Sequence, residues 1–325
     1  MTTENMDNSG VKWFVVINPV AGSGKGLDDY PLISKLLRDN SIRCEAVFTE
    51  HKCHATELTV SAVEKGYRNI IVIGGDGTLH EVVNGLYIQK VVSPSEIAVA
   101  VIAVGSGNDW IRMYGIPTHY SEAIRAIKDG YTFLQDVAEV EYEESLYRQT
   151  RHMANVAGIG FDAVVNKMYQ HKKIKGSTGR FTYLWCLIRS FFKHKSTGVK
   201  IWVDGKLIYN NLLFSIAIGV GKYNGGGMQQ LPAAIADDGL LDITMIKPVH
   251  WWHLLFRLRR LFNGTIYSIG HVMHAQGKHI RIESSPEIPL EVDGELLGAT
   301  PIEFNVLHRE VKVIVNRSFL DKLKK

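Results

Sequence analysis

The sequence is poor in cysteine and contains no long apolar run. Its three cysteines, Cys44, Cys53 and Cys186, cannot all pair and show no Cys-x-x-Cys spacing. A disulfide framework is therefore excluded, and reduced thiols of a cytoplasmic protein are the simplest account. No apolar run approaches the roughly 20 residues that span a bilayer, and residues 1–10 lack the layout of a secretion signal. We expect a cytoplasmic protein that meets any membrane from the water side.

The chain also has little net charge, because 37 Lys and Arg residues face 33 Asp and Glu residues. This basic excess is too small to indicate a nucleic acid partner, whereas an anionic nucleotide or membrane surface would suit it. With 325 residues, the chain exceeds the ~250–300 residues at which single cores stop growing, so two domains are expected. A composition of 46% hydrophobic and 22% charged residues is that of an ordinary globular protein.

The clearest motif is a glycine-rich turn that follows the apolar residues 70–73. It reads Gly74-Gly75-Asp76-Gly77-Thr78-Leu79-His80-Glu81. The pattern predicts a buried strand, a tight turn and then a helix, whose exposed backbone N–H groups can bind anionic oxygens. The carboxylate suits Mg²⁺, a water or a reacting hydroxyl, so Asp76 is the central candidate. The alternative is that Asp76 only caps the helix.

A second glycine-rich turn, residues 18–26, follows the strand-like residues 11–17. It fails the P-loop template, because Pro19 and Gly26 stand where that template needs glycine and Ser or Thr. It also fails Gly-x-Gly-x-x-Gly, because Leu27 replaces the third glycine. On these residues alone, a surface turn is the alternative reading.

A third turn, residues 105–112, follows the continuous apolar run 97–104. Trp110 stands where a dinucleotide fingerprint needs its third glycine. Asn108 and Asp109 either contact a ligand or cap the helix that begins at Trp110.

The segments change in character near residue 140. Strands and helices alternate up to about residue 137, which predicts a mostly parallel sheet with all three glycine turns at one edge. Short alternating strands with Asp-Gly turns follow, as at Asp204-Gly205 and Asp293-Gly294, and they predict an all-β sandwich.

Together these segments resemble the diacylglycerol kinase catalytic family, which includes sphingosine and ceramide kinases and bacterial lipid kinases. Gly-Gly-Asp-Gly-Thr is its signature, and NAD kinases and, more loosely, phosphofructokinases share it. The opening Asn-Pro-x-x-Gly-x-Gly also matches, and Gly-Ser-Gly-Asn-Asp-Trp resembles the family's Gly-Thr-x-Asn-Asp-Phe, with Ser106 for Thr and Trp110 for Phe. Residues 151–162 resemble the family's entry into its second domain.

The resemblance implies a Rossmann-like or phosphofructokinase-like nucleotide domain of α/β class over residues 11–140, completed by residues 309–325. It implies an antiparallel β-sandwich for the lipid substrate over residues 141–308. ATP and Mg²⁺ are the implied cofactors. The implied nucleotide contacts are Asn18, Pro19, Gly22, Ser23, Gly24, Lys25, Thr49, Gly74, Gly75, Asp76, Gly77, Thr78, Leu79, His80, Ser106, Asn108 and Asp109.

Two further segments resemble those of bacterial lipid kinases. In residues 231–242, a Mg²⁺ is implied on the Asp238 carboxylate and the carbonyls of Ile235 and Leu240; an ordinary Asp-Gly turn is the alternative. The Asp-Gly-Glu motif at Asp293 and Glu295 is implied to be catalytic, although it also reads as a good hairpin. We expect Glu295 to accept the hydroxyl proton, while Asp76 organises metal, water or substrate near the γ-phosphate.

Residues 180–193 and 251–262 combine aromatic and basic side chains. This composition suits helices at a membrane interface, and amphipathic helices packed on the sandwich are the alternative. The expected partner is thus a lipid substrate at the inner membrane surface, reached peripherally and without nucleic acid. Family members often form dimers, which leaves a homodimer open.

The sequence therefore predicts an ATP- and Mg²⁺-dependent lipid kinase, with diacylglycerol as the first candidate substrate. Phosphatidylglycerol, ceramide and sphingoid bases remain alternatives. An NAD kinase and a lipid- or nucleotide-sensing module are the rival classes.

Overall fold

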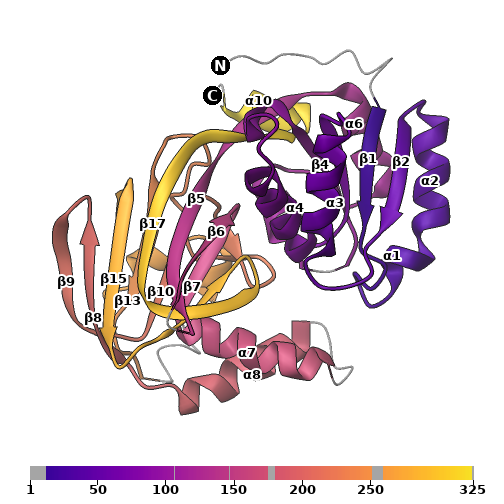
Figure 1. The fold of residues 1–325 in the computed structure, drawn as a ribbon. Coiled ribbons are helices and arrows are strands. Elements are labelled where there is room, and N and C mark those ends of the chain that lie inside the picture. Colours follow the sequence, from indigo (N-terminus) through magenta and orange to yellow (C-terminus); the bar gives the residue numbers. More distant parts are fainter. Residues whose placement is uncertain (1–11, 106, 146, 175–179, 251–258, 324–325) are drawn as a thin grey trace. The chain divides into compact units, whose positions relative to one another are not determined.

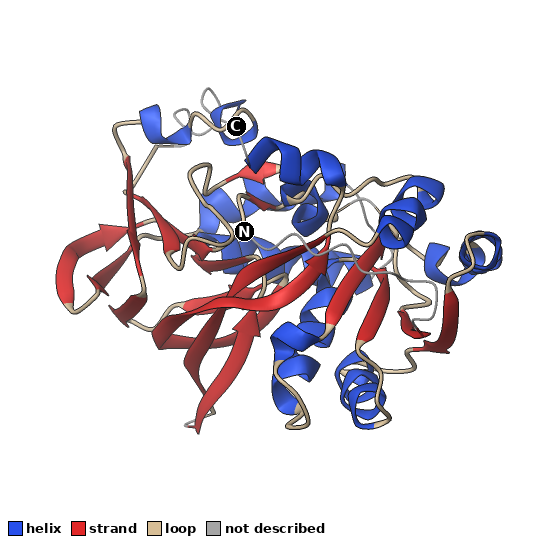
Figure 2. Ribbon diagram, turned by 90° about the horizontal axis from the view of Figure 1, so that it is seen from above, coloured by secondary structure: helices blue, strands red, loops and turns tan. Residues whose placement is uncertain are grey.

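The computed structural model describes residues 12–323 except 106, 146, 175–179 and 251–258, and it omits the side chains of residues 170, 173, 174, 180, 181, 183, 184 and 193. The chain divides into two compact units. Unit 1 comprises Met1–Gln135 and Arg309–Lys325, and unit 2 comprises Asp136–His308. Each unit has its own paired strands (Figures 1 and 2). Each also has its own hydrophobic core.

Unit 1 is built on a parallel sheet in the order β2-β1-β3-β4, with the end of β17 (Glu295–Ile314) beside β4. The other strands are β1 (Lys12–Ile17), β2 (Arg43–Phe48), β3 (Asn69–Gly74) and β4 (Ala98–Ala103). Every residue of β3 and β4 is buried. Continuous apolar sequences form these strands because both faces of a parallel sheet are covered.

Helices cover this sheet. They are α1 (Lys25–Asp28), α2 (Tyr30–Asp39), α3 (His54–Glu64), α4 (Asp76–Ile88), α5 (Asp109–Met113), α6 (Tyr120–Asp129), α10 (Arg317–Leu323) and the 3₁₀ turn η1 (Pro94–Glu96). Ile33 of α2 and Ile124 of α6 join the core formed with Val15 of β1, and α3 and α4 pack against each other. The helical spacing of apolar residues in α2 and α6 buries one face of each helix.

Unit 2 is antiparallel. Its strands are β5 (Thr132–Glu144, which begins in unit 1), β6 (Tyr147–Met153), β7 (Val156–Gly160), β8 (Thr197–Val203), β9 (Lys206–Leu213), β10 (Ser215–Gly219), β11 (Tyr223–Asn224), β12 (Met228–Gln229), β13 (Leu241–Ile246), β14 (Val272–Gly277), β15 (His279–Ser285) and β16 (Pro289–Val292). Its helical elements include α7 (Phe161–Ile174), α8 (Arg180–Lys193) and the 3₁₀ turn η2 (Ile266–Ser268), and residues 259–262 are helical as well. The strand order is β14-β13-β10-β7-β16-β17, and β17 continues through β15 to β8 and β9.

Two Asp-Gly turns close hairpins of unit 2. Asp204 and Gly205 have φ values of 49° and 79°, and Asp293 and Gly294 have φ values of 49° and 90°. Positive φ at both positions is the geometry of two-residue hairpins, for which Asp-Gly is a preferred pair.

The expected α/β nucleotide fold with an antiparallel β-sandwich is confirmed. The long yellow β17 in Figure 1 pairs first with β16 and ends beside β4.

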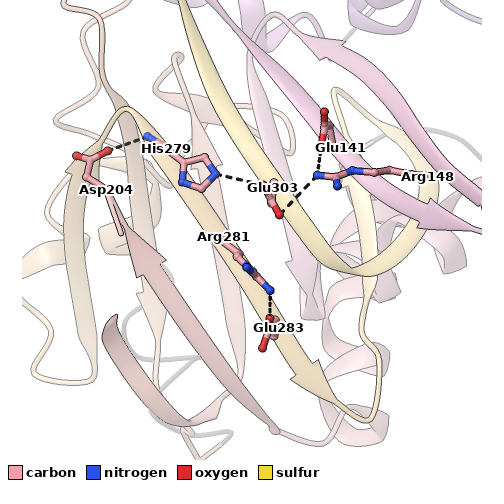
Figure 3. A network of polar contacts seen from close by, with 7 residues as sticks. All are labelled: Glu141, Arg148, Asp204, His279, Arg281, Glu283 and Glu303. Atoms are coloured by element: carbon pink, nitrogen blue, oxygen red, sulfur yellow. Dashed lines mark hydrogen bonds and ion pairs between the residues drawn. The ribbon is translucent and has the colours of Figure 1, made fainter. Parts of the chain in front are cut away.

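Charged side chains form a network on β5, β6, β15 and β17 (Figure 3). Arg148 contacts Glu141 and lies 3.5 Å from Glu303, and His279 lies 3.3 Å from Glu303. Exposed pairs of this kind contribute at most about 1 kcal/mol each. We interpret the network as part of the solvent-facing polar surface of the sheet.

Among the described residues, no helix has the length and apolarity needed to cross a bilayer. The expected aromatic helix at residues 180–193 is present as α8. Most of the second aromatic segment, residues 251–258, lies outside the described residues.

Candidate active site

The three glycine turns of unit 1 meet at one edge of its sheet. Ile17 of β1 lies opposite Ile73 of β3, and Gly74 lies opposite Ala103 of β4. The N–H of Asn18 donates to the carbonyl of Ile73 over 2.9 Å. The sheet register therefore places all three turns together, as parallel strands require.

The turns at residues 18–26 and 105–112 touch backbone to backbone. Gly22 has a φ of +60° and Gly105 a φ of +106°. A Cβ on Gly22 would lie 3.0 Å from the Cα of Gly105. Side chains are excluded here by both space and conformation.

Asp76 connects the turn at residues 74–81 to the turn at residues 105–112. It is the first residue of α4, and its carboxylate accepts hydrogen bonds from the N–H groups of Asp109 (2.8 Å) and Trp110 (3.2 Å). Trp110 in turn donates from Nε1 to Gln135 over 2.9 Å. Asp76 thus caps α5, which begins 33 residues later, and its own helix has no side-chain cap bond.

Other candidate nucleotide residues shape the turns. Asn18 donates from Nδ2 to Oγ1 of the buried Thr78 over 3.0 Å and accepts from the N–H of Val20 over 3.1 Å. Asn108, at a φ of 48°, donates from Nδ2 to the carbonyl of Gly105 over 3.0 Å. These side chains fix the backbone that a phosphate would meet.

The remaining candidates differ in exposure. Ser23, Lys25 and Gly77 are exposed, and Ser106 lies outside the described residues. Leu79 and His80 pack inward, with 3% and 2% exposure. The half-buried candidates are Asn18, Pro19, Gly22, Gly24, Thr49, Gly75 and Asp76, and Gly74, Thr78, Asn108 and Asp109 are buried.

Sequence reasoning missed Glu81 in the same motif. Its carboxylate accepts hydrogen bonds from the N–H groups of Cys53 (3.0 Å) and Ala55 (3.1 Å). It therefore caps the start of α3 and ties that helix to α4. The signal for this contact in the sequence was the acidic residue at the end of the motif.

In unit 2, Asp293 holds the Asp-Gly turn. It is 8% exposed and its carboxylate accepts hydrogen bonds from the N–H groups of Ala154, Asn155 and Val156 at 2.8, 3.0 and 3.1 Å. Three bonds to backbone fix the start of β7 against the turn. This geometry gives Asp293 a positioning role.

Glu295 is the half-buried first residue of β17, opposite Val292. The carbonyl of the preceding Gly294 accepts a hydrogen bond from Nδ2 of Asn166 over 2.8 Å. The N–H of Gly294 donates to the carboxylate of the buried Glu291. Asn166 of α7 therefore anchors the turn that carries Glu295. No motif in the sequence marked Asn166.

The candidate metal loop exposes its carboxylate. Asp238 is exposed and accepts a hydrogen bond from the N–H of Leu240 over 3.0 Å. Partial burial of the carboxyl and the neighbouring Asp237 raise the pKa of Asp238, while that hydrogen bond opposes the shift. Ile235 is 48% exposed. A carboxylate and main-chain carbonyls are oxygen donors of the kind that suits Mg²⁺.

A buried carboxylate that sequence reasoning missed supports this loop. Asp136 is fully buried and accepts from the N–H of Gly239 over 2.7 Å, and its other oxygen lies 2.9 Å from Nδ1 of His308. The N–H of Asp136 donates to the carbonyl of Ala236 over 2.7 Å. Asp136 therefore holds the loop on both sides of Asp238.

Two family models match the chain. The diacylglycerol kinase catalytic domain matches residues 12–140, and the YegS C-terminal NAD kinase beta sandwich-like domain matches residues 155–315. YtlR of Bacillus subtilis strain 168, named as a candidate lipid kinase, is 28% identical over 313 residues, which cover 89% of this chain and 94% of the relative. A diacylglycerol kinase of Staphylococcus carnosus is 25% identical over 300 residues, covering 92% and 93%.

A crystal structure of a candidate diacylglycerol kinase from Bacillus anthracis str. Sterne matches with a TM-score of 0.76 and 25% identity, covering 95% of this chain and 98% of that one. The fold and these matches define a lipid kinase. The chain belongs to the diacylglycerol kinase catalytic-domain family, in its bacterial lipid kinase branch.

Proposed function

We propose that the chain transfers the γ-phosphate of ATP, in the presence of Mg²⁺, to the hydroxyl of a lipid, with diacylglycerol as the first candidate and phosphatidic acid as the product. The observation that carries this proposal is the sheet edge of unit 1, where three glycine turns meet and Asp76 joins two of them. The names of relatives support the choice of lipid. Sphingosine, ceramide and phosphatidylglycerol are the alternative lipids.

The nucleotide phosphates would bind at this edge. The dipole of α4 favours negative charge at its N-terminus, where the first backbone N–H groups of a helix can donate to a phosphate. Lys25 is an exposed cation in the turn at residues 18–26. Asp76 keeps α5 against α4, and its half-buried carboxylate would organise metal, water or substrate near the γ-phosphate.

The Asp293–Glu295 turn would activate the lipid hydroxyl. The hydroxyl oxygen forms a bond to the γ-phosphorus, the bond to the leaving ADP oxygen breaks, and the Glu295 carboxylate accepts the hydroxyl proton. Asp293 keeps this turn in place through its three backbone hydrogen bonds.

Asp238, with the carbonyls of Ile235 and Leu240, would hold Mg²⁺. When bound, the ion neutralises phosphate charge. Asp136 keeps the loop in shape through Gly239. The lipid would be reached peripherally at the cytoplasmic face of the membrane, without nucleic acid, by a monomer or a homodimer.

Transfer of ³²P from γ-labelled ATP to a panel of lipids in mixed micelles tests the proposal, with NAD as the rival acceptor. The variants are Asp76→Ala and the control Glu122→Ala, which removes an exposed acidic residue from the first turn of α6. We expect a labelled lipid with wild type and the control, and none with Asp76→Ala. Labelled NADP would make the chain an NAD kinase, and no labelled product would favour a sensing module.

A further inference from the structure

Helices α7 and α8 lie side by side in unit 2 (Figure 1). One face of α8 is buried, with Cys186 and Ser190 at 0% exposure, and it packs with Phe161 and Val165 of α7. This core fixes which side of α8 faces outward.

The outward side carries large apolar side chains. Trp185, Ile188 and Phe192 are 42%, 40% and 67% exposed. Their spacing of three and four residues places them in one row along the helix. The row resembles the apolar face of an interfacial helix rather than a solvated surface.

The basic excess of the whole chain lies in residues 161–195, which include α7 and α8 and are called the α7–α8 hairpin below. Residues 161–195 contain eight of the 37 Lys and Arg residues but only one of the 33 Asp and Glu residues, which leaves 29 basic against 32 acidic residues elsewhere. That single acid, Asp162, is 9% exposed. The hairpin is therefore strongly positive on a chain that is otherwise slightly negative.

Two of these cations lie against the exposed indole. Nζ of Lys172 is 4.5 Å from the ring centre of Trp185, and Cζ of Arg189 is 5.0 Å from it. Cations beside a partly exposed ring combine two groups that favour the headgroup layer of an anionic membrane.

From this we infer that Trp185, Ile188 and Phe192 of α8, flanked by Arg189 and Lys172, form a docking face for an anionic lipid surface. This inference rests on the proposed lipid kinase function.

The same hairpin reaches the turn assigned to the lipid hydroxyl, which favours a membrane as the occupant. Asn166 of α7 donates to the carbonyl of Gly294, next to Glu295. Six residues further along α7 stands Lys172, about 9 Å away along the helix axis. A membrane held at the docking face would therefore lie close to the turn that receives the lipid.

Sedimentation with vesicles tests the docking face directly. The full-length protein is mixed with phosphatidylcholine vesicles that contain or lack phosphatidylglycerol. The variant is Ile188→Ser with Phe192→Ser, and the matched control is Leu207→Ser with Leu212→Ser in β9, where the two leucines are 46% and 49% exposed. We expect wild type and control to bind anionic vesicles, and the α8 variant to bind roughly tenfold or more weakly.

Arg189→Glu should weaken binding to anionic vesicles, and added salt should weaken binding of wild type. Equal binding by the α8 variant and wild type would overturn the inference. Equal losses in the variant and the β9 control would overturn it too. The inference would also fall if wild type were a dimer in sedimentation velocity and the α8 variant were a monomer that still bound vesicles. The face would then join two copies of the chain.

Phosphorylation of a short-chain, monomeric diacylglycerol separates this inference from the proposed function. We expect wild type and the α8 variant to phosphorylate the short-chain diacylglycerol equally. Only wild type should phosphorylate diacylglycerol efficiently when it is embedded in anionic vesicles. Vesicle binding that depends on the α8 face, without phosphorylation of any lipid, would support docking and refute the kinase proposal.

Discussion

Replacing Asp293 by alanine tests whether its carboxylate holds the turn. The side chain is 8% exposed and accepts three backbone hydrogen bonds of 2.8–3.1 Å. Alanine would leave three donors in a buried segment without their acceptor, at a position whose φ of 49° alanine tolerates less well than Asp. Hydrogen bonds to a charged group contribute roughly 1.5–3 kcal/mol each and do not simply add, so we expect a loss of about 4 kcal/mol.

Thermal unfolding followed by circular dichroism measures this loss. A domain of this size loses about 2–4 °C in Tm per kcal/mol, so Asp293→Ala should melt roughly 10 °C below wild type. Asp293→Asn keeps one acceptor oxygen and tolerates positive φ, and it should lose about half as much. Glu295→Gln changes a half-buried residue, and its Tm should stay within about 2 °C of wild type.

A Tm of Asp293→Ala within about 2 °C of wild type would refute the positioning role. A large loss in Glu295→Gln would show instead that both carboxylates hold the turn.

Three further changes test other parts of the chain. Burial lowers the pKa of His194, so the folded state resists its protonation and stability is lost as pH falls below about 6.5; Tm of wild type should drop more steeply between about pH 7 and 5 than that of His194→Gln. Asp238→Asn should raise the Mg²⁺ concentration needed for activity about tenfold or more, whereas Asp237→Asn should not, and a chelator should abolish wild-type activity. Gly105→Ala should raise KM for ATP about tenfold in an ATP titration; the control Gly115→Ala changes a glycine at a φ of +59° with nothing within 4 Å of its Cβ position, and its KM should not change.

The sheet edge of unit 1 could be predicted because its signals are local. Buried parallel strands leave continuous apolar runs such as residues 97–104, and glycines mark turns that side chains cannot enter. The Asp293-Gly294 hairpin could also be predicted, because the preference for this turn depends on two adjacent residues. The expected kinase class and fold were confirmed on these segments.

The supporting contacts could not be predicted, because they join residues far apart. Asp136 lies 103 residues from Gly239 and 172 residues from His308, and no spacing rule links such positions. No element was predicted between residues 163 and 179, so α7 and its Asn166 contact were missed. The reading of Asp76 as a cap of its own helix was wrong, because its carboxylate caps α5 instead. Its role as a ligand residue stays a prediction.

Turnover of Glu295→Gln in the ATP-to-lipid transfer assay tests the central claim most directly. The control is Glu303→Gln, which changes a second glutamate of β17 in the network of Figure 3. We predict that Glu295→Gln remains folded and loses kcat by about 100-fold or more, because a proton acceptor contributes 10²–10⁴-fold, with KM for ATP unchanged and the control fully active. Full turnover of a folded Glu295→Gln variant would contradict the account.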